Sequence, residues 1–342
     1  MRHRPPLVQR PRRQRGAALL TAMIIVTLVA TLATAMVWQQ WRAVQVESAE
    51  RARAQAGWIL SGALQFAALI LKETVHPGKP TALTDPWATP LAEARLSTFL
   101  AADKANADDG PEAFLAGSIA DAQARYNLRN LVTQAQPPAS GGSAPASGGG
   151  APAPGPKISE PDLETLARLC QTVGVGADVA SRIAQGMLQA SATPLTGAAP
   201  LMPETVAQLT WFGVDPAAVA ALQPYVVLLP TDTKPKLNVN TASKEALAAV
   251  MGGDSSRAER LVQIRQRTPL KTLEEVDAQL GQALTPAAKA QLTTQSTFFE
   301  VRGRLRLVDR VLVERSIVQR QINGKVVVLS RERVASLEQV GG

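Results

Sequence analysis

The segment from Arg12 to Trp38 reads RRQRGAALLTAMIIVTLVATLATAMVW. Its arginines end at Arg15, Gly16 follows, and the next charged residue is Arg42. Residues 17–38 are therefore uncharged and mostly apolar. A helix of this length spans about 33 Å, which is enough to cross the hydrocarbon core of a bilayer. The pattern predicts a transmembrane helix at residues 17–38.

The flanks of this helix predict its orientation. Six arginines lie within the first 16 residues, whereas the residues after the helix mix both signs of charge, as in Glu47 and Arg51. Trp38 and Trp41 stand where an interfacial aromatic belt is expected. Because positive residues favour the cytoplasmic side, we expect a single pass with the N-terminus in the cytoplasm and the bulk of the chain outside it.

Three interpretations of the segment compete. A cleaved secretory signal could use the small residues Ala33-Thr34-Ala35, although the apolar run continues past them to Trp38. A plain anchor would keep the whole segment. In the third interpretation the chain is cut at Gly16, which precedes the apolar run, where signal peptidase would not cut.

A family resemblance favours the third interpretation. A basic leader at residues 1–16, which ends in Gly16 and is followed by Ala17-Ala18-Leu19-Leu20, resembles the type III signal of type IV pilins and type II secretion pseudopilins. The resemblance implies that prepilin peptidase cleaves between Gly16 and Ala17 on the cytoplasmic face. The apolar helix then stays on the mature protein.

The fifth residue after the glycine is Thr21. Most members of the resembled family carry glutamate there, and that charge needs a partner in hydrocarbon, namely the amino terminus of a neighbouring subunit. Thr21 can make no ion pair. The K component of the type II secretion system is known for lacking this glutamate, which suggests a subunit with no predecessor, at the filament tip. In a simpler, compatible interpretation, the Thr21 hydroxyl bonds to its own helix backbone.

Apolar residues continue the helix beyond the membrane at a spacing of four, three and four: Ile59, Ala63, Phe66 and Ile70. The break at Pro77-Gly78 predicts an end at Lys72 or Thr74. We therefore expect one N-terminal helix over residues 17–74.

Composition limits the possible functions. The net charge of +8 is concentrated in the leader, since the rest of the chain carries 30 basic and 28 acidic residues, too even a balance to attract nucleic acid. Cys170, the one cysteine, is expected to be a core thiol, and His76 lies in a polar loop. Without a phosphate-binding loop, a HExxH motif or a nucleophile elbow, the sequence predicts neither an enzyme nor a cofactor. Asp103, Asp108 and Asp109 could suit calcium, but no ligand set can be assigned.

The stretch GSIADAQARYNLRNLV, residues 117–132, predicts a strand and a turn within a first head segment at residues 75–136. It resembles a stretch of the K family at eight positions: Asp121, Gln123, Arg125, Tyr126, Asn127, Leu128, Asn130 and Leu131. Residues 137–157 are dominated by Pro, Ala, Ser and Gly, and predict a linker that cannot bury enough apolar surface to fold.

Residues 158–295 predict a compact helical domain. The helix starts combine a capping residue with an early proline: Ser159 with Pro161, Asp215 with Pro216, and Thr285 with Pro286. The stretch LNVNTASKEALAAV is expected to enter a helix at Asn240 or Thr241.

This domain also resembles the helix-hairpin-helix segments of DNA-uptake and repair proteins, at residues 236–280 and 174–187. Those hairpins direct backbone amides at a phosphate. Here Asp178 and Asp254 place carboxylates near that point. The arginines that could form a basic face (Arg257, Arg260, Arg265 and Arg267) are opposed by acids (Glu259, Glu274, Glu275 and Asp277). We expect a structural use of the fold and no nucleic acid; the alternative is a membrane-anchored DNA-binding protein of the competence type.

The last block alternates apolar and polar residues. It predicts three antiparallel strands, at residues 297–308, 310–321 and 325–334, with a type I′ hairpin turn at Asn323-Gly324. The sheet segment is expected at residues 296–336 and a tail at 337–342. The fold class is α+β: a long N-terminal helix packed on a pilin-like antiparallel sheet, with the α-domain inserted into that sheet as the K family implies.

Together, the resemblance implies a minor pseudopilin of the K type in the bacterial inner membrane, with the bulk of the chain in the periplasm. Its implied role is to cap the tip of the pseudopilus and to start its assembly. The implied partners are the minor pseudopilins I and J, other pseudopilins, prepilin peptidase and secreted cargo.

Overall fold

The structure, a computed structural model, describes residues 15–74, 78–96, 113–133, 155–192, 199–230, 233–307, 310–321 and 323–334. The chain forms two compact units, residues 1–58 and 59–342.

Helix α1 covers Arg15–Glu73, which confirms the predicted end near residue 72. In the first unit its apolar side chains are exposed; Leu19, Ile24 and Leu32 keep 67%, 62% and 55% of their surface. Among the described residues, α1 is the helix that is long and apolar enough to cross a membrane. Such a surface is stable in hydrocarbon and costly in water.

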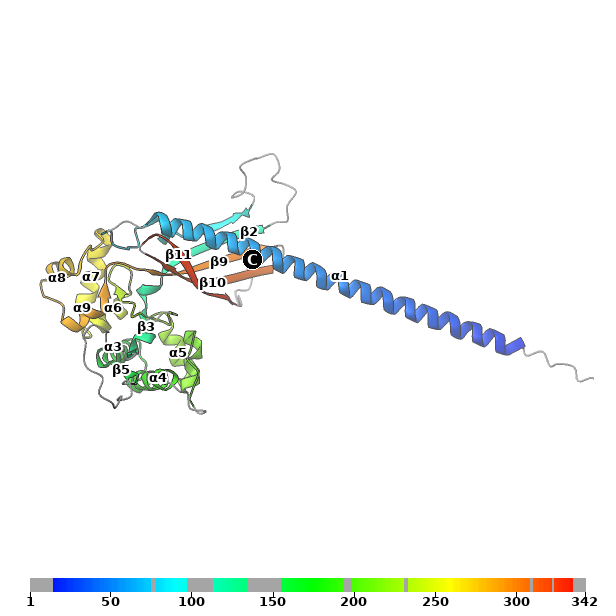
Figure 1. Cartoon of the computed structure of the whole chain (residues 1–342), viewed down its shortest axis with the longest axis horizontal. Helices are drawn as coiled ribbons and strands as arrows, with labels where there is room; N and C mark the ends of the chain where they lie inside the picture. Colours follow the sequence, from blue (N-terminus) through cyan, green and yellow to red (C-terminus); the bar gives the residue numbers. More distant parts are fainter. Residues whose placement is uncertain are drawn as a thin grey trace, which may run out of the picture. The chain divides into compact units, whose positions relative to one another are not determined.

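In the second unit, the last turns of α1 cover one face of the sheet (Figure 1). The contact is apolar and joins α1 to two strands and to the 3-10 helix η1 (Pro86–Ala88): Leu64, Ala67, Leu71, Trp87, Phe299, Val301 and Val318. The Trp87 and Phe299 rings meet edge to face, with centroids 5.3 Å apart. This is the predicted packing of the long helix on an antiparallel sheet.

The sheet has the order β1-β2-β9-β10-β11, and each neighbouring pair is antiparallel. Its strands are β1 (Leu91–Arg95), β2 (Ala113–Asp121), β9 (Phe298–Leu307), β10 (Arg310–Arg320) and β11 (Val326–Val334). The last three are the predicted strands. β2 pairs with β9 although the helical region separates them in sequence, so the predicted α+β class and the insertion of the helices into the sheet are both confirmed.

The turn between β10 and β11 lies where it was predicted, but its type differs. The N–H of Gln321 donates to the carbonyl of Lys325 at 2.8 Å, and the N–H of Gly324 donates to the carbonyl of Gln321 at 2.9 Å. The loop is therefore three residues long, with Gly324 at φ 77°. A three-residue hairpin places glycine in this left-handed conformation, so the predicted two-residue type I′ turn is wrong.

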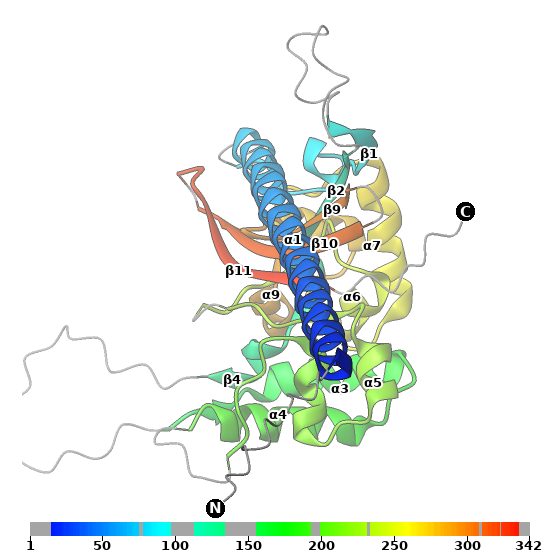
Figure 2. The same cartoon turned by 90° about the vertical axis from the view of Figure 1, so that its right-hand side faces the viewer.

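The inserted region contains two hydrophobic cores among the described residues. The first is built from α3 (Glu160–Thr172), α4 (Ala177–Ala190), the 3-10 helix η5 (Val206–Phe212) and α5 (Pro216–Leu222). The second is built from α6 (Lys244–Val250), α7 (Ser255–Arg267), α8 (Leu273–Leu280) and α9 (Pro286–Gln291). Figure 2 shows the helices of the insert beside the sheet.

Short strand pairs close these cores. β3 (Tyr126–Asn127) runs parallel to β6 (Val226–Val227), and β7 (Leu237–Asn238) runs parallel to β8 (Leu292–Thr293). β4 (Val132–Thr133) pairs antiparallel with β5 (Lys157–Ile158), so the chain on either side of the low-complexity linker is held together. Residues 134–154, which include most of that linker, lie outside the described part.

Capping explains most helix starts. Asp215 accepts a hydrogen bond from the N–H of Ala217 at 2.7 Å, and Thr285 accepts one from the N–H of Ala288 at 3.2 Å, as predicted. The predicted start at Asn240 or Thr241 is wrong, because α6 begins at Lys244 behind the cap Ser243. The side chains of Asn240 and Thr241 are instead buried and bonded to distant residues.

Candidate assembly sites

The predicted processing site lies in the first turn of α1, which begins at Arg15 and contains Gly16 and Ala17. Thr21 follows on the same helix, and its hydroxyl donates to the carbonyls of Ala17 and Ala18 at 3.1 and 3.0 Å. The interpretation in which Thr21 bonds to its own helix is confirmed. The Thr21 hydroxyl has its hydrogen-bond partners within its own helix, and it offers no charge to a neighbouring subunit. Cleavage after Gly16 stays a prediction.

A buried polar joint connects the insert to the sheet around Asp121, the last residue of β2. One carboxylate oxygen accepts from Asn238 at 3.0 Å, from Thr241 at 2.6 Å and from Ser296 at 2.6 Å. The other accepts from the N–H of Gln123 at 2.8 Å. Burial raises the pKa of Asp121, and these hydrogen bonds act against that rise. The joint thus ties β2, β7, the turn before α6 and the segment that leads into β9 to one carboxylate.

Arg320, at the end of β10, lies at the edge of this joint. Its guanidinium donates to the hydroxyl of Thr81 at 3.1 Å and to the carbonyl of Ser296 at 2.9 Å. It also stacks on Phe299, 4.7 Å from the ring centroid. Burial lowers the pKa of Arg320, while the charges of Asp121 and Asp85 raise it. A positive group therefore balances the buried carboxylate of Asp121.

The other residues that match the K family lie in this joint or in the first core of the insert. Gln123 accepts from the N–H of Thr297 at 2.7 Å and donates to the carbonyl of Lys236 at 2.8 Å. Further polar contacts of this stretch include Arg125 with Glu300, Tyr126 with Asp162, Asn127 with the N–H of Leu229, and Asn130 with the carbonyl of Pro235. Leu128 and Leu131 are fully buried in the first core. The sequence pointed to these residues by resemblance, but their partners, more than a hundred residues away in several cases, gave no local signal.

Three arginines of the helix-hairpin-helix stretches, Arg182, Arg257 and Arg265, bond within the chain, whereas Arg260 and Arg267 are exposed. Arg182 donates to the carbonyl of Gly213 at 2.8 Å and pairs with Asp178 at 3.0 Å. Arg265 donates to the carbonyl of Val239 at 2.7 Å, and burial lowers its pKa to about 10. Asp254 accepts from the N–H of Arg257 at 2.9 Å, which places a carboxylate at the N-terminus of α7. A phosphate would meet that carboxylate first.

Cys170 is fully buried in the first core, as predicted, and burial raises the pKa of its thiol to about 11. The thiol is therefore protonated and inert near neutral pH. Within the described residues, no group of three or more His, Cys, Asp or Glu side chains could hold a metal. His76, Asp103, Asp108 and Asp109 lie outside the described residues.

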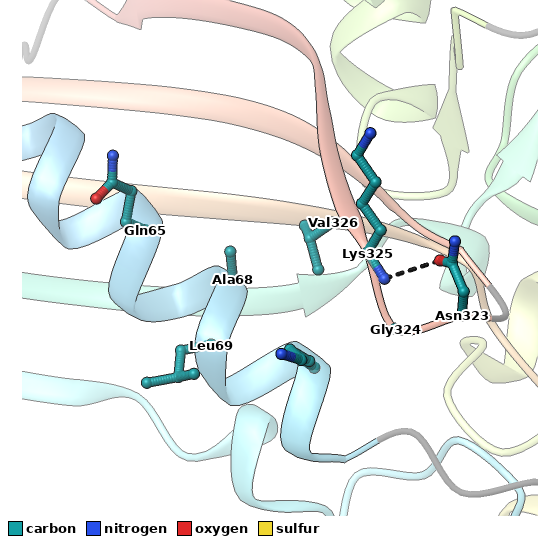
Figure 3. Close-up of a pocket in the computed structure, with 8 residues that line it drawn as sticks. Gln65, Ala68, Leu69, Asn323, Gly324, Lys325 and Val326 are labelled. Atoms are coloured by element: carbon teal, nitrogen blue, oxygen red, sulfur yellow. Dashed lines mark hydrogen bonds between the residues drawn. The ribbon is translucent and has the colours of Figure 1, made fainter.

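An open groove lies between α1 and the hairpin of β10 and β11 (Figure 3). The helix contributes Gln65, Ala68, Leu69 and Lys72, and the hairpin contributes residues 323–326. The backbone N–H of Lys325 donates to the side chain of Asn323 at 3.0 Å and rigidifies the turn. Leu69 stays 52% exposed at its edge.

Comparisons with known proteins agree with this architecture. A family model described as type II secretion system (T2SS), protein K, matches residues 237–295, and another with the same description matches residues 124–231. These ranges largely coincide with the second and the first core of the insert. The type II secretion system protein K of Pseudomonas aeruginosa is 25% identical over 350 residues, covering 94% of this chain and 93% of the relative. That of Klebsiella pneumoniae is 29% identical over 332 residues, covering 90% of this chain and 96% of the relative.

The fold also matches a solved structure. A chain in the crystal structure of the GspK-GspI-GspJ complex from the enterotoxigenic Escherichia coli type 2 secretion system superposes with a TM-score of 0.61. The match covers 84% of this chain and 99% of that chain at 20% sequence identity. At that identity the likeness concerns the fold.

Proposed function

This chain belongs to the family of type II secretion system protein K, and we propose that it caps the tip of the pseudopilus and starts its assembly. In this proposal the protein acts by assembly and performs no catalysis. It would be drawn into the filament through its N-terminal helix and present its head at the end of the fibre.

The observation that carries this proposal is the local satisfaction of Thr21. In the pseudopilin resemblance, a glutamate at this place pairs with the amino terminus of the subunit ahead. The Thr21 hydroxyl bonds to the carbonyls of Ala17 and Ala18, so it needs no partner in the membrane. A subunit without this charge requires nothing ahead of it, which suits the first position of a filament.

The inserted helical region also supports a position at the tip of the filament. A head made of α1 and the five-stranded sheet has the elements of a pilin-like subunit, and the two additional helical cores enlarge it. The polar joint around Asp121 holds them to the sheet by buried hydrogen bonds. A bulky, firmly attached insert is easier to accommodate at the end of a filament than beneath another subunit.

Processing and topology follow from the N-terminal segment. We propose that prepilin peptidase removes residues 1–16 by cleavage between Gly16 and Ala17. Residues 17–38 would stay in the bacterial inner membrane, with the amino terminus in the cytoplasm and the remainder in the periplasm. The helical domain at 158–295 and the strands at 296–336 would then belong to one periplasmic head.

The partners proposed for this chain are the minor pseudopilins I and J. The matched structure is a complex of GspK with GspI and GspJ, which supports the assignment. In the second unit, Phe66 and Leu69 of α1 keep 53% and 52% of their surface exposed, which leaves apolar surface for neighbouring helices. Other pseudopilins below the tip and secreted cargo above it would be further contacts.

Immunogold labelling of assembled pseudopili tests the position. A short epitope would replace part of the low-complexity segment at 137–154, and the fibres would be sheared from cells that secrete normally. The proposal expects gold at one end of a fibre and a loss of fibres when this chain is deleted. Gold spaced along the fibre, or normal fibre numbers without this chain, would overturn it.

A further inference from the structure

The sheet face turned away from α1 carries a row of arginines. On β9, Phe299 and Val301 pack with α1, and a side chain at Gly303 would come within 3.1 Å of Leu60. Because side chains alternate along a strand, Arg302, Arg304 and Arg306 point to the opposite face. This position is unrelated to the groove beside α1.

Neighbouring strands extend the row. Arg315 of β10 lies directly opposite Arg302 in the register, and Phe114 of β2 lies opposite Arg306. Arg95 of β1 lies opposite Phe114, whose ring is flanked by two guanidinium groups, Arg306 at 4.0 Å and Arg95 at 5.7 Å. We call the surface formed by these residues the arginine face: Arg95, Phe114, Arg302, Arg304, Arg306 and Arg315.

The arginine face carries a surplus of positive charge. Glu93 is shared by Arg304 at 3.1 Å and Arg306 at 2.6 Å. Glu300 is shared by Arg302 and Arg125, and Glu332 pairs with Arg315 at 2.8 Å. Among the described residues, these three carboxylates are thus shared by five guanidinium groups, those of Arg125, Arg302, Arg304, Arg306 and Arg315. The balance leaves about two positive charges for an outside partner.

The clustering of arginines on neighbouring strands lowers the stability of the sheet on its own. Like charges directly opposite on neighbouring strands, as at Arg302 and Arg315, destabilise a sheet. Exposed ion pairs return little of that cost. The arginine side chains stay accessible, with 58% of Arg302, 37% of Arg306 and 34% of Arg304 exposed. This arrangement adds little to the stability of the fold. It nevertheless holds the guanidinium groups in place by shared carboxylates and ring stacking, which suits the binding of a partner molecule.

The chemistry of the face selects its partner. A guanidinium group binds a carboxylate through two parallel hydrogen bonds, and arginines on alternate residues of β9 lie about 6.7 Å apart. Nucleic acid carries a charge about every 1.7 Å, so its backbone would also be forced against Glu93 and Glu332. A protein segment with spaced carboxylates avoids them. We propose that the arginine face is a docking surface for an acidic protein segment.

Binding of a defined peptide to the full chain in detergent micelles tests this proposal. The probe is a labelled peptide of about 12 residues with glutamate at alternate positions, the spacing of an extended strand. A glutamine peptide of the same length and a duplex DNA of similar charge are the comparison ligands. The expected result is binding of the glutamate peptide at physiological salt, with at least about tenfold weaker binding of either comparison ligand.

Two triple variants of equal charge locate the binding. Changing Arg302, Arg304 and Arg306 to Gln should weaken peptide binding about tenfold. The matched control changes Arg260, Arg267 and Arg333 to Gln; these are exposed arginines of α7 and of the other sheet face. The control should stay within about twofold of the wild type, because distant charges are screened by salt.

A variant that should bind the peptide more tightly separates a specific effect on binding from misfolding, because a misfolded protein would not gain affinity. Glu93→Gln removes a carboxylate that occupies two arginines, so it should tighten peptide binding about threefold. Equal losses in the two triple variants, no gain in Glu93→Gln, no detectable peptide binding, or tighter binding of duplex DNA than of the peptide would each overturn the proposal.

Discussion

The side-chain amide of Asn238 donates a hydrogen bond of 3.0 Å to the carboxylate of Asp121, across 117 residues of sequence. Asp121 ends β2 of the sheet, and Asn238 ends β7, which leads into the second core of the insert. Both side chains are buried. The orientation of the insert on the sheet therefore rests on polar bonds that water cannot replace without opening the head.

The first prediction concerns this joint. Asp121→Asn offers one carbonyl oxygen where the carboxylate offers two, so the N–H of Gln123 or of Asn238 loses its acceptor. A buried donor without a partner costs about 1–3 kcal/mol, which corresponds to a fall in Tm of about 2–12 °C. Circular dichroism of the full chain in detergent at neutral pH measures the change.

Asp178→Asn serves as the control for this variant. Asp178 is an exposed acid of α4, paired with an exposed Arg182, and its replacement should change the free energy of unfolding by less than about 0.5 kcal/mol. If Asp121→Asn unfolds at the same temperature as the wild type, the joint does not hold the insert.

The second prediction concerns pH. Burial of Glu300 acts to raise its pKa, but Arg125 and Arg302 outweigh burial, and the folded-state pKa is lowered. The stabilisation is therefore complete above the pKa of an unfolded glutamate, about 4.3, and is lost as the pH falls through the lower folded-state value. Glu300→Gln should be less stable than the wild type at pH 7, by about 1–3 kcal/mol.

The quantity to follow is the difference in free energy of unfolding between the wild type and Glu300→Gln. Denaturant unfolding from pH 7 down to about 3 should show that this stability difference becomes smaller below about pH 4.3. The opposite pH dependence of Asp121, whose pKa is raised, is common to both proteins and cancels. A difference that stays constant over this range would show that the charge of Glu300 contributes nothing.

The third prediction uses two helical glycines. A side-chain carbon at Gly186 in α4 would lie 2.3 Å from Cγ of Phe212, whereas one at Gly62 in α1 meets nothing within 4 Å. Alanine gains about 0.5–1 kcal/mol of helix stability over glycine, and overpacking costs about 1–3 kcal/mol. Gly62→Ala should therefore stabilise the head and Gly186→Ala should destabilise it.

Thermal unfolding of both variants checks this contrast. Because the substitution is the same, the difference between them isolates the contact with Phe212. Stabilisation by Gly186→Ala would mean that the ring moves freely and that α4 and η5 are not tightly packed.

The fourth prediction concerns Thr21. Since its hydroxyl bonds only to carbonyls of its own helix among the described residues, Thr21→Val should secrete cargo within about twofold of the wild type, the scale of a lost local hydrogen bond. Thr21→Glu places an unpaired charge in the membrane at a cost of about 2.5–3.5 kcal/mol and should reduce secretion. Secretion of a reporter enzyme into the medium measures both. Improved secretion with glutamate would argue for a subunit ahead of this one.

The sequence was most informative where short-range rules act. The end of α1, the strands β9, β10 and β11, and the caps at Asp215 and Thr285 follow from hydrophobic period and local hydrogen bonds. Each of these signals is contained in a few neighbouring residues, so no tertiary contact was needed to read it.

Predictions from local sequence failed where a side chain forms its hydrogen bond with a residue distant in sequence. Asn240 and Thr241 have the chemistry of helix caps, but Asn240 bonds with the backbone of Leu270 and Thr241 with Asp121. Ser243, left without such a partner, caps α6 instead. In the hairpin, Gly324 is left-handed as expected, but the bond between Gln321 and Lys325 makes the loop one residue longer.

Mass spectrometry of the chain purified after co-expression with a prepilin peptidase tests the assembly role most directly. Cleavage between Gly16 and Ala17 with retention of α1 predicts a mature protein that begins at Ala17 and still partitions into the membrane. A protein that begins at Met36, or one that keeps residues 1–16 when the peptidase is active, would contradict it.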